Sequence, residues 1–418
     1  MTMTTTISPS DNVLVPFAKQ LRQEHPSVGI AKLLQQLKQA HPDWAVSEKR
    51  LKKVLQPPSS TEPGLVADTG IDPTLNASEI APKVKVRLFG GEKGKGLVAK
   101  DKILQGEVLW QEEPWVVTAD SSLQAPLLQQ QMCSQCFTAF PLRNPPLSVS
   151  CPHCDMAHFC NRLCLSKAQS SAHHPLLCPG QNKGALELLK YIHRNAARHL
   201  DATAKIVAKW RAGDANVYQR VWEGMARVNL EKKEMERKEW EFVGEQRRKE
   251  WGTAHQLLIN ALNPPTTSPN YKSFQKLVTK GRKSPPSEEE LDRWFSFNNF
   301  LELLGLASIN QEDSGGLYAL HAHINHSCEP NLMARNLPKT FVPPVDLPCS
   351  PPPPNAPGVR GTNKLTMVAR RTIHPGEELT LPYVNFNLDR EDRRRMLREL
   401  YGFWCDCPKC QREAKSSS

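Results

Sequence analysis

The sequence predicts an α+β fold that is partly held together by zinc. Segments with the alternating apolar pattern of strands lie at 83–118 and between 364 and 383, on either side of a long helical stretch at about 184–310. Ten of the twelve cysteines fall into two tight clusters, at 133–178 and 405–410. Strands separated by a run of helices favour an α+β architecture, and clustered cysteines favour metal sites.

Composition and charge narrow the class of protein. At about 150 residues per domain, a chain of 418 residues suggests two or three domains. No run approaches the ~18 apolar residues of a membrane span, and the start of the chain lacks the basic and apolar regions of a secretory signal, so we expect no membrane association. The excess of 54 Lys and Arg over 43 Asp and Glu, a formal charge of +11, fits an acidic partner such as nucleic acid or a nucleosome surface.

The cysteines also indicate a compartment. A disulfide framework needs an oxidising environment, and the sequence offers no route to one. In a reducing cell, cysteine pairs with CxxC spacing and a nearby histidine are typical zinc ligands. We therefore expect thiolate-bound zinc in a protein of the nucleus and cytoplasm.

Residues 13–56 are predicted to form a small helical unit of two short helices. Apolar residues with helical spacing mark the first helix: Ile30, Leu33, Leu34 and Leu37. Ser47 is placed to cap a second, basic helix over 48–55. A basic helix of this kind fits either a nucleic-acid-binding module or a solvated helical hairpin that contacts proteins. Residues 57–82, rich in Pro, Ser and Asp, are predicted to be a linker.

The helical stretch at about 184–310 is predicted to include a mixed-charge surface helix over 231–251. It is also predicted to include a helix that is opened by a capping box at Ser287 and Glu290 and continues through Leu304. A last helix is predicted over about 389–401, and Gly402 is expected to end it.

The first cysteine cluster contains enough ligands for two tetrahedral zinc sites. Its seven thiols and one imidazole come in four pairs: Cys133 and Cys136, Cys151 and Cys154, Cys160 and Cys164, His174 and Cys178. Sites in which the protein fills all four positions are structural rather than catalytic. His173 is an alternative to His174, whereas a histidine such as His153 or His158 is more often a bystander in such a loop than a ligand.

The second cluster supplies three thiolates and lacks a fourth zinc ligand nearby. These thiolates belong to Cys405, Cys407 and Cys410. The candidates for the fourth ligand are Cys328 and Cys349. Cys349 lies in the proline-rich segment 338–361, so Cys328 is favoured. A zinc ion held in this way would tie the C-terminal tail to the segment 325–327.

Four further segments carry the residues with the strongest functional pattern. They are the glycine turn Glu92–Leu97, the segment Ile324–Asn331, the segment Glu377–Tyr383 and the tail Tyr401–Cys410. Taken alone, the turn and the tyrosine have structural explanations, because a glycine turn is usually a hairpin and a tyrosine at a strand end usually belongs to the core. Their joint occurrence in this order is far more specific.

In this order the four segments resemble the SET domain of protein lysine methyltransferases, with its glycine turn, NHSCxPN motif, GEELTxxY motif and cysteine-rich post-SET tail. The spacing in the cluster at 133–178 resembles the MYND zinc finger. The combination is similar to the SET-and-MYND family, and most similar to its fungal branch, which methylates histone lysines. The resemblance covers about residues 83–412 and implies an α+β chain: a SET-domain β-fold with an inserted MYND zinc finger, a helical insert and a zinc-binding post-SET tail.

The resemblance also divides the chain and pairs its zinc ligands. The expected parts are an N-terminal helical extension at 1–56, a linker at 57–82, the two parts of the SET domain at 83–129 and 316–386, a MYND-type finger at 130–180, a helical insert at 181–315 and a post-SET tail at 387–413. Because ligand pairs interleave in MYND fingers, two sets of zinc ligands are implied: Cys133, Cys136, Cys160 and Cys164, and Cys151, Cys154, His174 and Cys178. With the tail site, the resemblance implies three structural zinc ions.

The implied activity is transfer of a methyl group from S-adenosylmethionine to a lysine amine, with histone tails as the expected substrate. Such an in-line displacement depends mainly on alignment in a dry site, where a lysine loses its proton more easily. Tyr383 and Tyr401 are the expected catalytic residues, and Phe403 would complete an aromatic channel and cover the cofactor. The remaining cofactor contacts are assigned to Asn325 and His326 and to the backbone of Lys93, Gly94, Lys95 and Gly96.

Two alternatives to this reading stay open at the level of sequence. One is a methyltransferase of non-histone proteins, and the other is a non-catalytic MYND/SET chromatin adaptor. A histone tail is a basic substrate, so the favoured interpretation predicts an acidic peptide groove, although the chain as a whole is basic.

Overall fold

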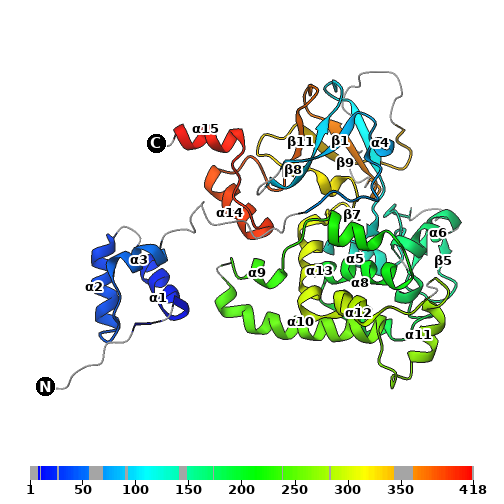
Figure 1. Ribbon diagram of the computed structural model, residues 1–418, viewed down its shortest axis with the longest axis horizontal. Coiled ribbons are helices and arrows are strands. Elements are labelled where there is room, and N and C mark those ends of the chain that lie inside the picture. The colour runs from blue at the N-terminus through cyan, green and yellow to red at the C-terminus, as the bar shows by residue number, and fades with distance from the viewer. Residues whose placement is uncertain are drawn as a thin grey trace. The chain divides into compact units, whose positions relative to one another are not determined.

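The computed structural model divides the chain into two compact units, Met1–Pro63 and Gly64–Ser418 (Figure 1). The structure describes residues 8–9, 11–25, 28–55, 69–89, 93–140, 148–172, 174–237, 239–281, 284–342 and 361–416. The boundary between the units falls within the predicted linker 57–82. His173, Cys349 and most of the proline-rich segment 338–361 lie outside the described residues.

The N-terminal unit has three helices in its described part, one more than the sequence predicts: α1 (Asp11–Glu24), α2 (Ile30–Ala40) and α3 (Glu48–Leu55). Proline normally disrupts a helix interior, so the presence of Pro16 explains why the sequence pattern did not predict α1. The helix forms because its apolar side packs into the core of the unit, whose buried residues include Leu14, Ala18, Leu33, Leu37 and Leu51. The predicted cap is present, because the Oγ of Ser47 accepts the backbone N–H of Arg50 at 3.2 Å.

Two small sheets form the β part of the second unit. The first has the strand order β1-β2-β11-β8, with β1 at Val84–Leu88, β2 at Lys95–Ala99, β11 at Glu378–Leu381 and β8 at Asn325–His326. β8 runs parallel to β11, and the other neighbours are antiparallel. Segments that are far apart in the sequence therefore lie side by side in one sheet (Figure 1).

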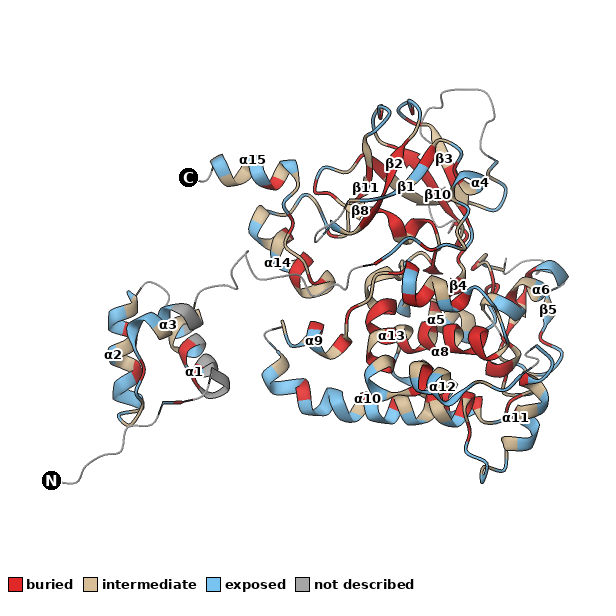
Figure 2. Cartoon of the chain, in the orientation of Figure 1, coloured by how far each residue is buried: buried red, intermediate tan, exposed pale blue. Residues whose placement is uncertain are grey.

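The second sheet has the antiparallel order β3-β10-β9, with β3 at Val108–Glu112, β10 at Leu365–Ala369 and β9 at Leu332–Asn336. Two ribbons of paired strands accompany the sheets: β4 (Val116–Val117) with β7 (Gly316–Leu317), and β5 (Val149–Ser150) with β6 (His158–Phe159). Every residue of β2 and β10 is buried, and Figure 2 shows the buried positions gathered in these strands. The core of the β part therefore includes one central strand from each sheet.

A helical part covers most of residues 185–310. Its helices are α7 (Ala185–Arg194), α8 (Arg198–Arg211), the π-helical turn Gln219–Gly224, α9 (Leu230–Glu234), α10 (Trp240–Leu262), α11 (Tyr271–Val278), α12 (Glu288–Phe295) and α13 (Phe297–Asn310). Trp294 is fully buried in its core, with ring centres 5.1 Å from Trp210 and 5.5 Å from Trp222. Packed aromatic rings of this size supply much of the apolar burial that stabilises a helical core.

The single mixed-charge helix predicted over 231–251 is wrong, because the structure breaks it into α9 and α10. Lys233 is buried, and its Nζ donates to the Oγ of Ser308 at 2.8 Å and to the carbonyl oxygen of Leu400 at 3.2 Å. A buried ammonium group needs such partners, and these two hydrogen bonds hold α9 in its position. The sequence pattern contained no sign of these distant partners.

The helix predicted from 287 through 304 is also two helices. Ser296 has an extended backbone, with φ −64° and ψ 147°, and separates α12 from α13. Trp294 and Phe300 are six residues apart, so they would lie on different sides of one continuous helix. The break allows both side chains to be fully buried in the same core.

Shorter elements complete the second unit: α4 (Ala77–Ile80), α5 (Ser121–Leu128), α6 (Arg162–Ser171), the 3-10 turns Pro175–Leu177 and His321–His323, α14 (Arg390–Tyr401) and α15 (Pro408–Ser416). The predicted capping box at Ser287 and Glu290 is present. The helix predicted over 389–401 is present as α14, and Gly402 ends it with a left-handed φ of 82°. No helix among the described residues has both the length and the apolar character needed to cross a membrane.

A buried ion pair fixes the beginning of the second unit against its helical part. The side chain of Asp72 is 1% exposed and accepts hydrogen bonds from Nε of Arg220 at 2.8 Å and from the backbone and hydroxyl of Thr74. Burial alone would raise the pKa of Asp72, but the hydrogen bonds from Thr74 and Arg220 outweigh burial, and the pKa lies below its ordinary value. The charged form of Asp72 is therefore stabilised by the fold.

We expect Asp72→Asn to lower the free energy of unfolding at pH 7 by roughly 2–3 kcal/mol, because Arg220 loses the charge that compensates its own burial. The folded pKa of Asp72 is lowered, so its contribution is complete above the ordinary aspartate pKa of about 3.9 and is lost as the pH falls through the folded value. The difference between wild type and variant should therefore shrink in acid. Denaturant unfolding at neutral and acidic pH measures both effects.

The exposed Asp101 provides a matched control for this substitution. Asp101→Asn should leave the unfolding free energy within about 0.5 kcal/mol of wild type at each pH. Equal stability of Asp72→Asn and wild type at pH 7 would contradict the role assigned to the ion pair.

Candidate functional site

Three of the segments with functional motifs meet in the first sheet. β11 pairs with β2 on one side and with β8 on the other. In the second pairing, Thr380 lies opposite Asn325 and Leu381 lies opposite His326. The glycine turn leads directly into β2, so all three segments converge at one place.

The side chain of Asn325 joins these strands. Its Nδ2 donates to the carbonyl oxygen of Lys95 at 2.7 Å and to Oε1 of Glu378 at 2.9 Å. Gly96 leaves room for this arrangement, since a Cβ at that position would lie 2.8 Å from Nδ2 of Asn325 and 2.6 Å from a ring carbon of Phe89. Any side chain at position 96 would therefore displace one of these neighbours.

The turn before β2 is held by an ion pair and by a glycine conformation. Nζ of Lys93 forms an ion pair with Glu378 and lies 4.5 Å from the ring centre of Phe89. Gly94 has a φ of 61°, in the left-handed region that favours glycine. The backbone of the turn is thus fixed beside Asn325.

Lys95 directs its ammonium group into the interior. The residue is 4% exposed, and its Nζ has no hydrogen-bond partner among the described residues. Burial lowers the pKa of Lys95 to about 7, an effect that the carboxylate of Asp72 opposes and the guanidinium of Arg227 increases. A buried ammonium without a partner is costly, so its surroundings suit an added anionic group.

His326 links β8 to the segment that follows β11. Its Nδ1 accepts the backbone N–H of Tyr383 at 3.0 Å, and its Nε2 lies 3.3 Å from Sγ of Cys328. Burial lowers the pKa of His326 to about 4. The ring is therefore neutral at pH 7, which is the form that can accept the N–H of Tyr383.

Tyr383 lies two residues beyond β11, and its hydroxyl donates to the carbonyl oxygen of Ile324. Burial raises the pKa of the Tyr383 hydroxyl well above its ordinary value, and the neighbouring Tyr401 and the carboxylates of Glu312 and Glu378 raise it further. The hydroxyl therefore stays protonated at physiological pH. It is a positioned polar group and not a base.

Tyr401 and Phe403 surround Tyr383. Their ring centres lie 4.8 Å and 6.4 Å from that of Tyr383, and Phe403 lies 6.2 Å from His326. The hydroxyl of Tyr401 donates to the carbonyl oxygen of Tyr383 at 3.3 Å. The aromatic residues selected from the sequence thus form a single cluster.

A short acidic segment influences this cluster. Burial raises the pKa of Tyr401 to about 12, and the charges of Glu312 and Asp313 add to this effect while Arg198 opposes it. The side chain of Asp313 is 79% exposed and pairs with Arg198, and Oε1 of Glu312 lies 3.5 Å from Nε2 of His321. The sequence predicted an acidic groove but named no residue, and these two carboxylates are its candidates.

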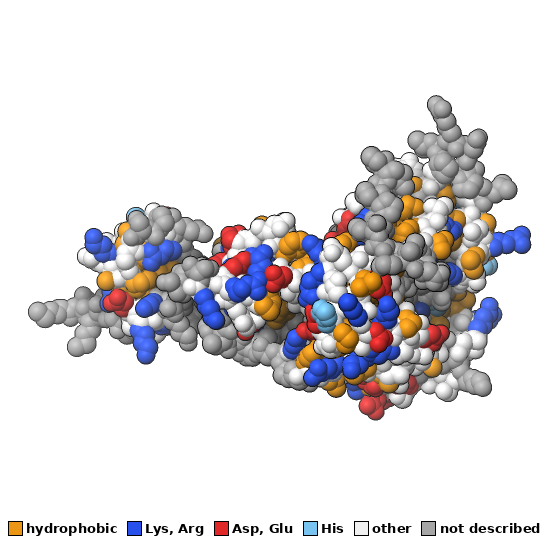
Figure 3. Space-filling view, turned by 90° about the horizontal axis from the view of Figure 1, so that it is seen from above, with side chains coloured by type: hydrophobic (Ala, Val, Ile, Leu, Met, Phe, Trp, Pro, Cys, Tyr) orange, Lys and Arg blue, Asp and Glu red, His pale blue; other side chains and the backbone are white. Residues whose placement is uncertain are grey.

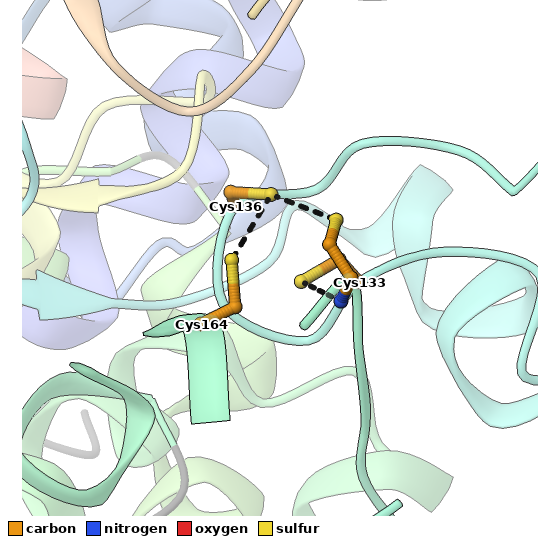
Figure 4. A group of neighbouring side chains, drawn as sticks. Cys133, Cys136 and Cys164 are labelled. Carbon is orange, nitrogen blue, oxygen red and sulfur yellow. Dashed lines mark hydrogen bonds between the residues drawn. The ribbon is translucent and has the colours of Figure 1, made fainter. Parts of the chain in front are cut away.

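Four thiols of the first cysteine cluster meet in one group, formed by Cys133, Cys136, Cys160 and Cys164 within 4.8 Å of one another. Sγ of Cys136 lies 3.6 Å from that of Cys160 and 3.9 Å from that of Cys164. Thiolates around a tetrahedral zinc with bonds of about 2.3 Å would stand about 3.8 Å apart, whereas disulfide sulfurs stand about 2.05 Å apart. Figure 4 shows Cys136 and Cys164 directed toward each other.

A second group contains the thiols of Cys151, Cys154 and Cys178. Sγ of Cys151 lies 3.9 Å from Sγ of Cys178. His174 is buried immediately before the short turn that leads to Cys178, and its Nδ1 accepts the backbone N–H of Leu176 at 3.1 Å. Within the described part of the chain, the ligand atoms of this group that all lie within 4.8 Å of one another are the three thiols.

The tail thiols meet Cys328. Its Sγ lies 3.9 Å from that of Cys405 and 3.6 Å from that of Cys410, and Cys407 completes a group within 4.8 Å. Nη2 of Arg393, on α14, lies 3.7 Å from Sγ of Cys410. A guanidinium beside a group of thiols favours their thiolate form. All eleven cysteines in the described residues are free of disulfides.

The sequence reasoning missed two residues that fix the site. Glu378 accepts from Asn325 and pairs with Lys93. Asn331 is buried, its Nδ2 donates to the carbonyl oxygen of Glu378, and its Oδ1 accepts the N–H of Thr380, both at 2.8 Å. Both residues stand inside segments already singled out, and each precedes a buried leucine, Leu379 and Leu332. Buried polar groups are normally hydrogen-bonded, but the partners here come from other segments, so the local pattern could not name them.

The fold and the site define a SET-type protein. The SET domain family matches residues 94–384, which is more than half of the chain, and the chain belongs to this family. It is a lysine methyltransferase of the SMYD-like branch that also holds the fungal relatives described next.

The curated relatives resemble the chain over most of its length. The histone-lysine N-methyltransferase SET5 of Mycosarcoma maydis is 28% identical over 366 residues, which cover 81% of this chain and 69% of that protein. SET5 of Yarrowia lipolytica is 26% identical and covers 93% of this chain and 78% of its own length. The protein-lysine N-trimethyltransferase SMYD5 of Mus musculus is 24% identical, with 79% of this chain and 87% of that protein covered.

We expect Gly96→Ala to lower the free energy of unfolding by roughly 1–3 kcal/mol, because the added methyl group must push Asn325 out of its two hydrogen bonds. Gly252→Ala is a matched control on α10, where a Cβ would meet nothing within 4 Å. There the same change should stabilise the chain by up to about 1 kcal/mol. Denaturant unfolding measures both changes. A Gly96→Ala protein as stable as wild type would contradict the close approach of Asn325 and Phe89 to position 96.

Proposed function

We propose that this lysine methyltransferase transfers a methyl group from S-adenosylmethionine to lysines of histone tails, through the site around Tyr383. The observation that carries the proposal is the convergence of Tyr383, Tyr401, Phe403 and the Asn325–His326 step on one sheet edge. The two fungal relatives, which are named as histone-lysine methyltransferases, support the histone part of the proposal.

S-adenosylmethionine supplies a methyl group on a sulfonium, together with an adenine and an amino-acid end that carries a carboxylate. The residues present fit these groups. The buried, unpartnered ammonium of Lys95 suits the carboxylate, and the fixed backbone of Lys93–Gly96 offers a close approach. Asn325 and His326 would hold the amino-acid and adenine ends, and Phe403 would cover them.

Tyr383 and Tyr401 are the proposed catalytic residues. The protonated hydroxyl of Tyr383 is anchored and would orient the attacking amine. The rings of Tyr401 and Phe403 would form an apolar channel in which a lysine gives up its proton more easily. Their faces also favour the positive charge of a sulfonium or methylammonium. Alignment in a dry site is the main contribution that such groups make to the rate.

The acidic segment supports a basic peptide as substrate. Glu312 and Asp313 influence the aromatic cluster electrostatically, and Asp313 is largely exposed to solvent. Carboxylates at such a position would attract a segment rich in Lys and Arg, as a histone tail is. We extend the proposal to a nuclear location, because histones are the substrates that the fungal relatives' names give.

We further propose three structural zinc ions, one for each thiol group. Residues 130–180 would be a MYND-type finger with two ions, and residues 387–413 a post-SET tail with one. In the second site His174 would be the fourth ligand through Nε2, because its Nδ1 already accepts the N–H of Leu176. The ions would hold loops in place and take no part in the chemistry.

The proposed function is tested by labelled methyl transfer to nucleosomes, with the modified residue mapped afterwards. We expect Tyr383→Phe to reduce kcat by about 100-fold or more, because it removes one preorganised polar contact at the reacting centre. Calorimetry should give a similar affinity for S-adenosylmethionine, since the hydroxyl acts in the transition state and not in ground-state binding.

Tyr218→Phe is the matched control, because Tyr218 begins the π-helical turn of the helical part, its ring packs against Arg293, and the change should leave turnover unchanged. A Tyr383→Phe protein that turns over at the wild-type rate would move the catalytic role to Tyr401. Methylation mapped only to non-histone proteins would overturn the histone part of the proposal.

We expect Cys328→Ser to reduce the bound zinc from three ions to about two and to weaken binding of S-adenosylmethionine. Loss of one thiolate opens the tail site, and the tail then no longer holds Phe403 beside His326. Metal analysis of the purified full-length protein measures the first effect, and calorimetry measures the second.

Cys349→Ser is the parallel control, and it should change neither the metal content nor the affinity. Three zinc ions in the Cys328→Ser protein would contradict the assignment of Cys328 as a ligand.

A further inference from the structure

The N-terminal unit carries an uneven distribution of charge. Its helical range 11–55 contains eight Lys and Arg against four Asp and Glu. α2 has two lysines and no acidic residue, and α3 has four basic residues and only Glu48 as an acid. The positive excess is therefore concentrated on the second and third helices. A short basic helix often presents only a solvated face, so the arrangement of its side chains decides whether it can bind a partner.

The lysines of these two helices are available to a partner. Lys32 and Lys38 on α2, and Lys49 and Lys52 on α3, are all exposed. Within the described residues, none of their ammonium groups forms an ion pair or a hydrogen bond. Lysines on the second unit are often paired instead, as Lys249 is with Glu245. Four unpaired cations on so small a unit are a ready counterpart for an anionic surface.

The scaffold holds these lysines in fixed positions. Leu51 of α3 is buried in the core of the unit, so α3 cannot rotate about its own axis without losing that contact. Arg50 is used internally, since its guanidinium donates to Oγ of Ser8 at 2.8 Å and to the carbonyl oxygen of Pro9. Lys49 and Lys52 are therefore left on the outer side of an anchored helix.

Aromatic packing fixes the connection between the two basic helices. The rings of His41 and Trp44, in the segment that joins α2 to α3, are stacked with centres 3.9 Å apart. Phe17 of α1 meets both edge-on, at 4.5 Å and 5.4 Å. A connection held by three rings keeps the spacing between the lysines of α2 and α3 constant.

From these observations we propose that the N-terminal unit binds duplex DNA through the exposed lysines of α2 and α3. Lysine binds phosphate as a point charge, and a duplex presents a regular row of phosphates to a rigid set of cations. A protein partner would need an apolar centre, but the exposed residues of α2 are Ala31, Lys32, Gln35, Lys38, Gln39 and Ala40. Figure 3 shows Lys and Arg side chains spread over the visible face of this unit, at the left of the view.

The proposal concerns binding and does not depend on methyl transfer. It is tested with the full-length chain and a short labelled DNA duplex by fluorescence anisotropy, without S-adenosylmethionine. Wild type should bind with an affinity that falls steeply between about 50 mM and about 200 mM salt. Failure of this test would leave the proposed catalytic function untouched, and failure of the methyl-transfer assay would leave this binding untouched.

The decisive variant carries Lys32→Gln, Lys38→Gln, Lys49→Gln and Lys52→Gln together. Because each lost phosphate contact removes about 0.9 from the slope of log affinity against log salt, four losses should flatten it by about 3 to 4. The affinity near 0.1 M salt should fall by roughly 100-fold or more. Circular dichroism of the same samples should show an unchanged helix content, because all four side chains are exposed.

Two controls separate this surface from charge in general. A variant with Arg at the same four positions keeps the charge, so its affinity and its slope of log affinity against log salt should match those of wild type. This result would also show that the positions tolerate substitution. The exposed lysines Lys272, Lys276 and Lys280 on and after α11, changed to Gln, should alter affinity less than about twofold.

Several results would overturn the proposal. These are the absence of salt-dependent DNA binding by wild type, an unchanged slope in the four-Gln variant, or an equal loss in the α11 variant. Binding of wild type to a histone dimer but not to DNA alone would instead make the unit a protein-docking module.

Discussion

The approach of the tail thiols to Cys328 is the contact on which the site depends. Cys328 follows the Asn325–His326 step of β8, and the thiols that meet it follow Tyr401 and Phe403 almost directly. Because the thiols join the segment of Cys328 to the tail, the aromatic residues of the tail face the edge of the sheet. α14, with the sequence REDRRRMLRELY, has few apolar residues of its own and would have little reason to pack there otherwise.

The helical part supports this closure from the other side. Lys233 of α9 holds the carbonyl oxygen of Leu400 at 3.2 Å, one residue before Tyr401. Glu236, just after α9, accepts from both Nε and Nη2 of the buried Arg398 at 3.1 Å and 3.2 Å. Lys233 and Glu236 are three residues apart, so α9 and the turn that follows it present both residues to α14. The aromatic cluster is braced by charge–dipole and charge–charge contacts as well as by the thiols.

Much of the architecture could be predicted because its signals are local. Thiol spacing, the capping box at 287–290 and the glycine that ends α14 depend on chemistry within a few residues. The features that could not be predicted depend on distant partners: α1 forms in spite of Pro16 through tertiary packing, and α9 is placed by a buried lysine. The position of Glu312 and Asp313 near the aromatic cluster belongs to the same class, because no local pattern links them to Tyr401. His174 stays a prediction from its spacing, since the thiols that the structure brings together beside it are those of Cys151, Cys154 and Cys178.

The long sequence separation within the tail group has a consequence for biosynthesis. Cys328 is 77 residues from Cys405 and 82 from Cys410, and a ribosome releases the chain in order. Strands β2, β8 and β11 all emerge before the tail does, so a nascent chain can pair its sheet while Cys328 still lacks its partners. The aromatic cluster can then assemble only after the sheet, when the tail has emerged. A chain interrupted shortly before residue 401 would hold a finished sheet with an unfinished site.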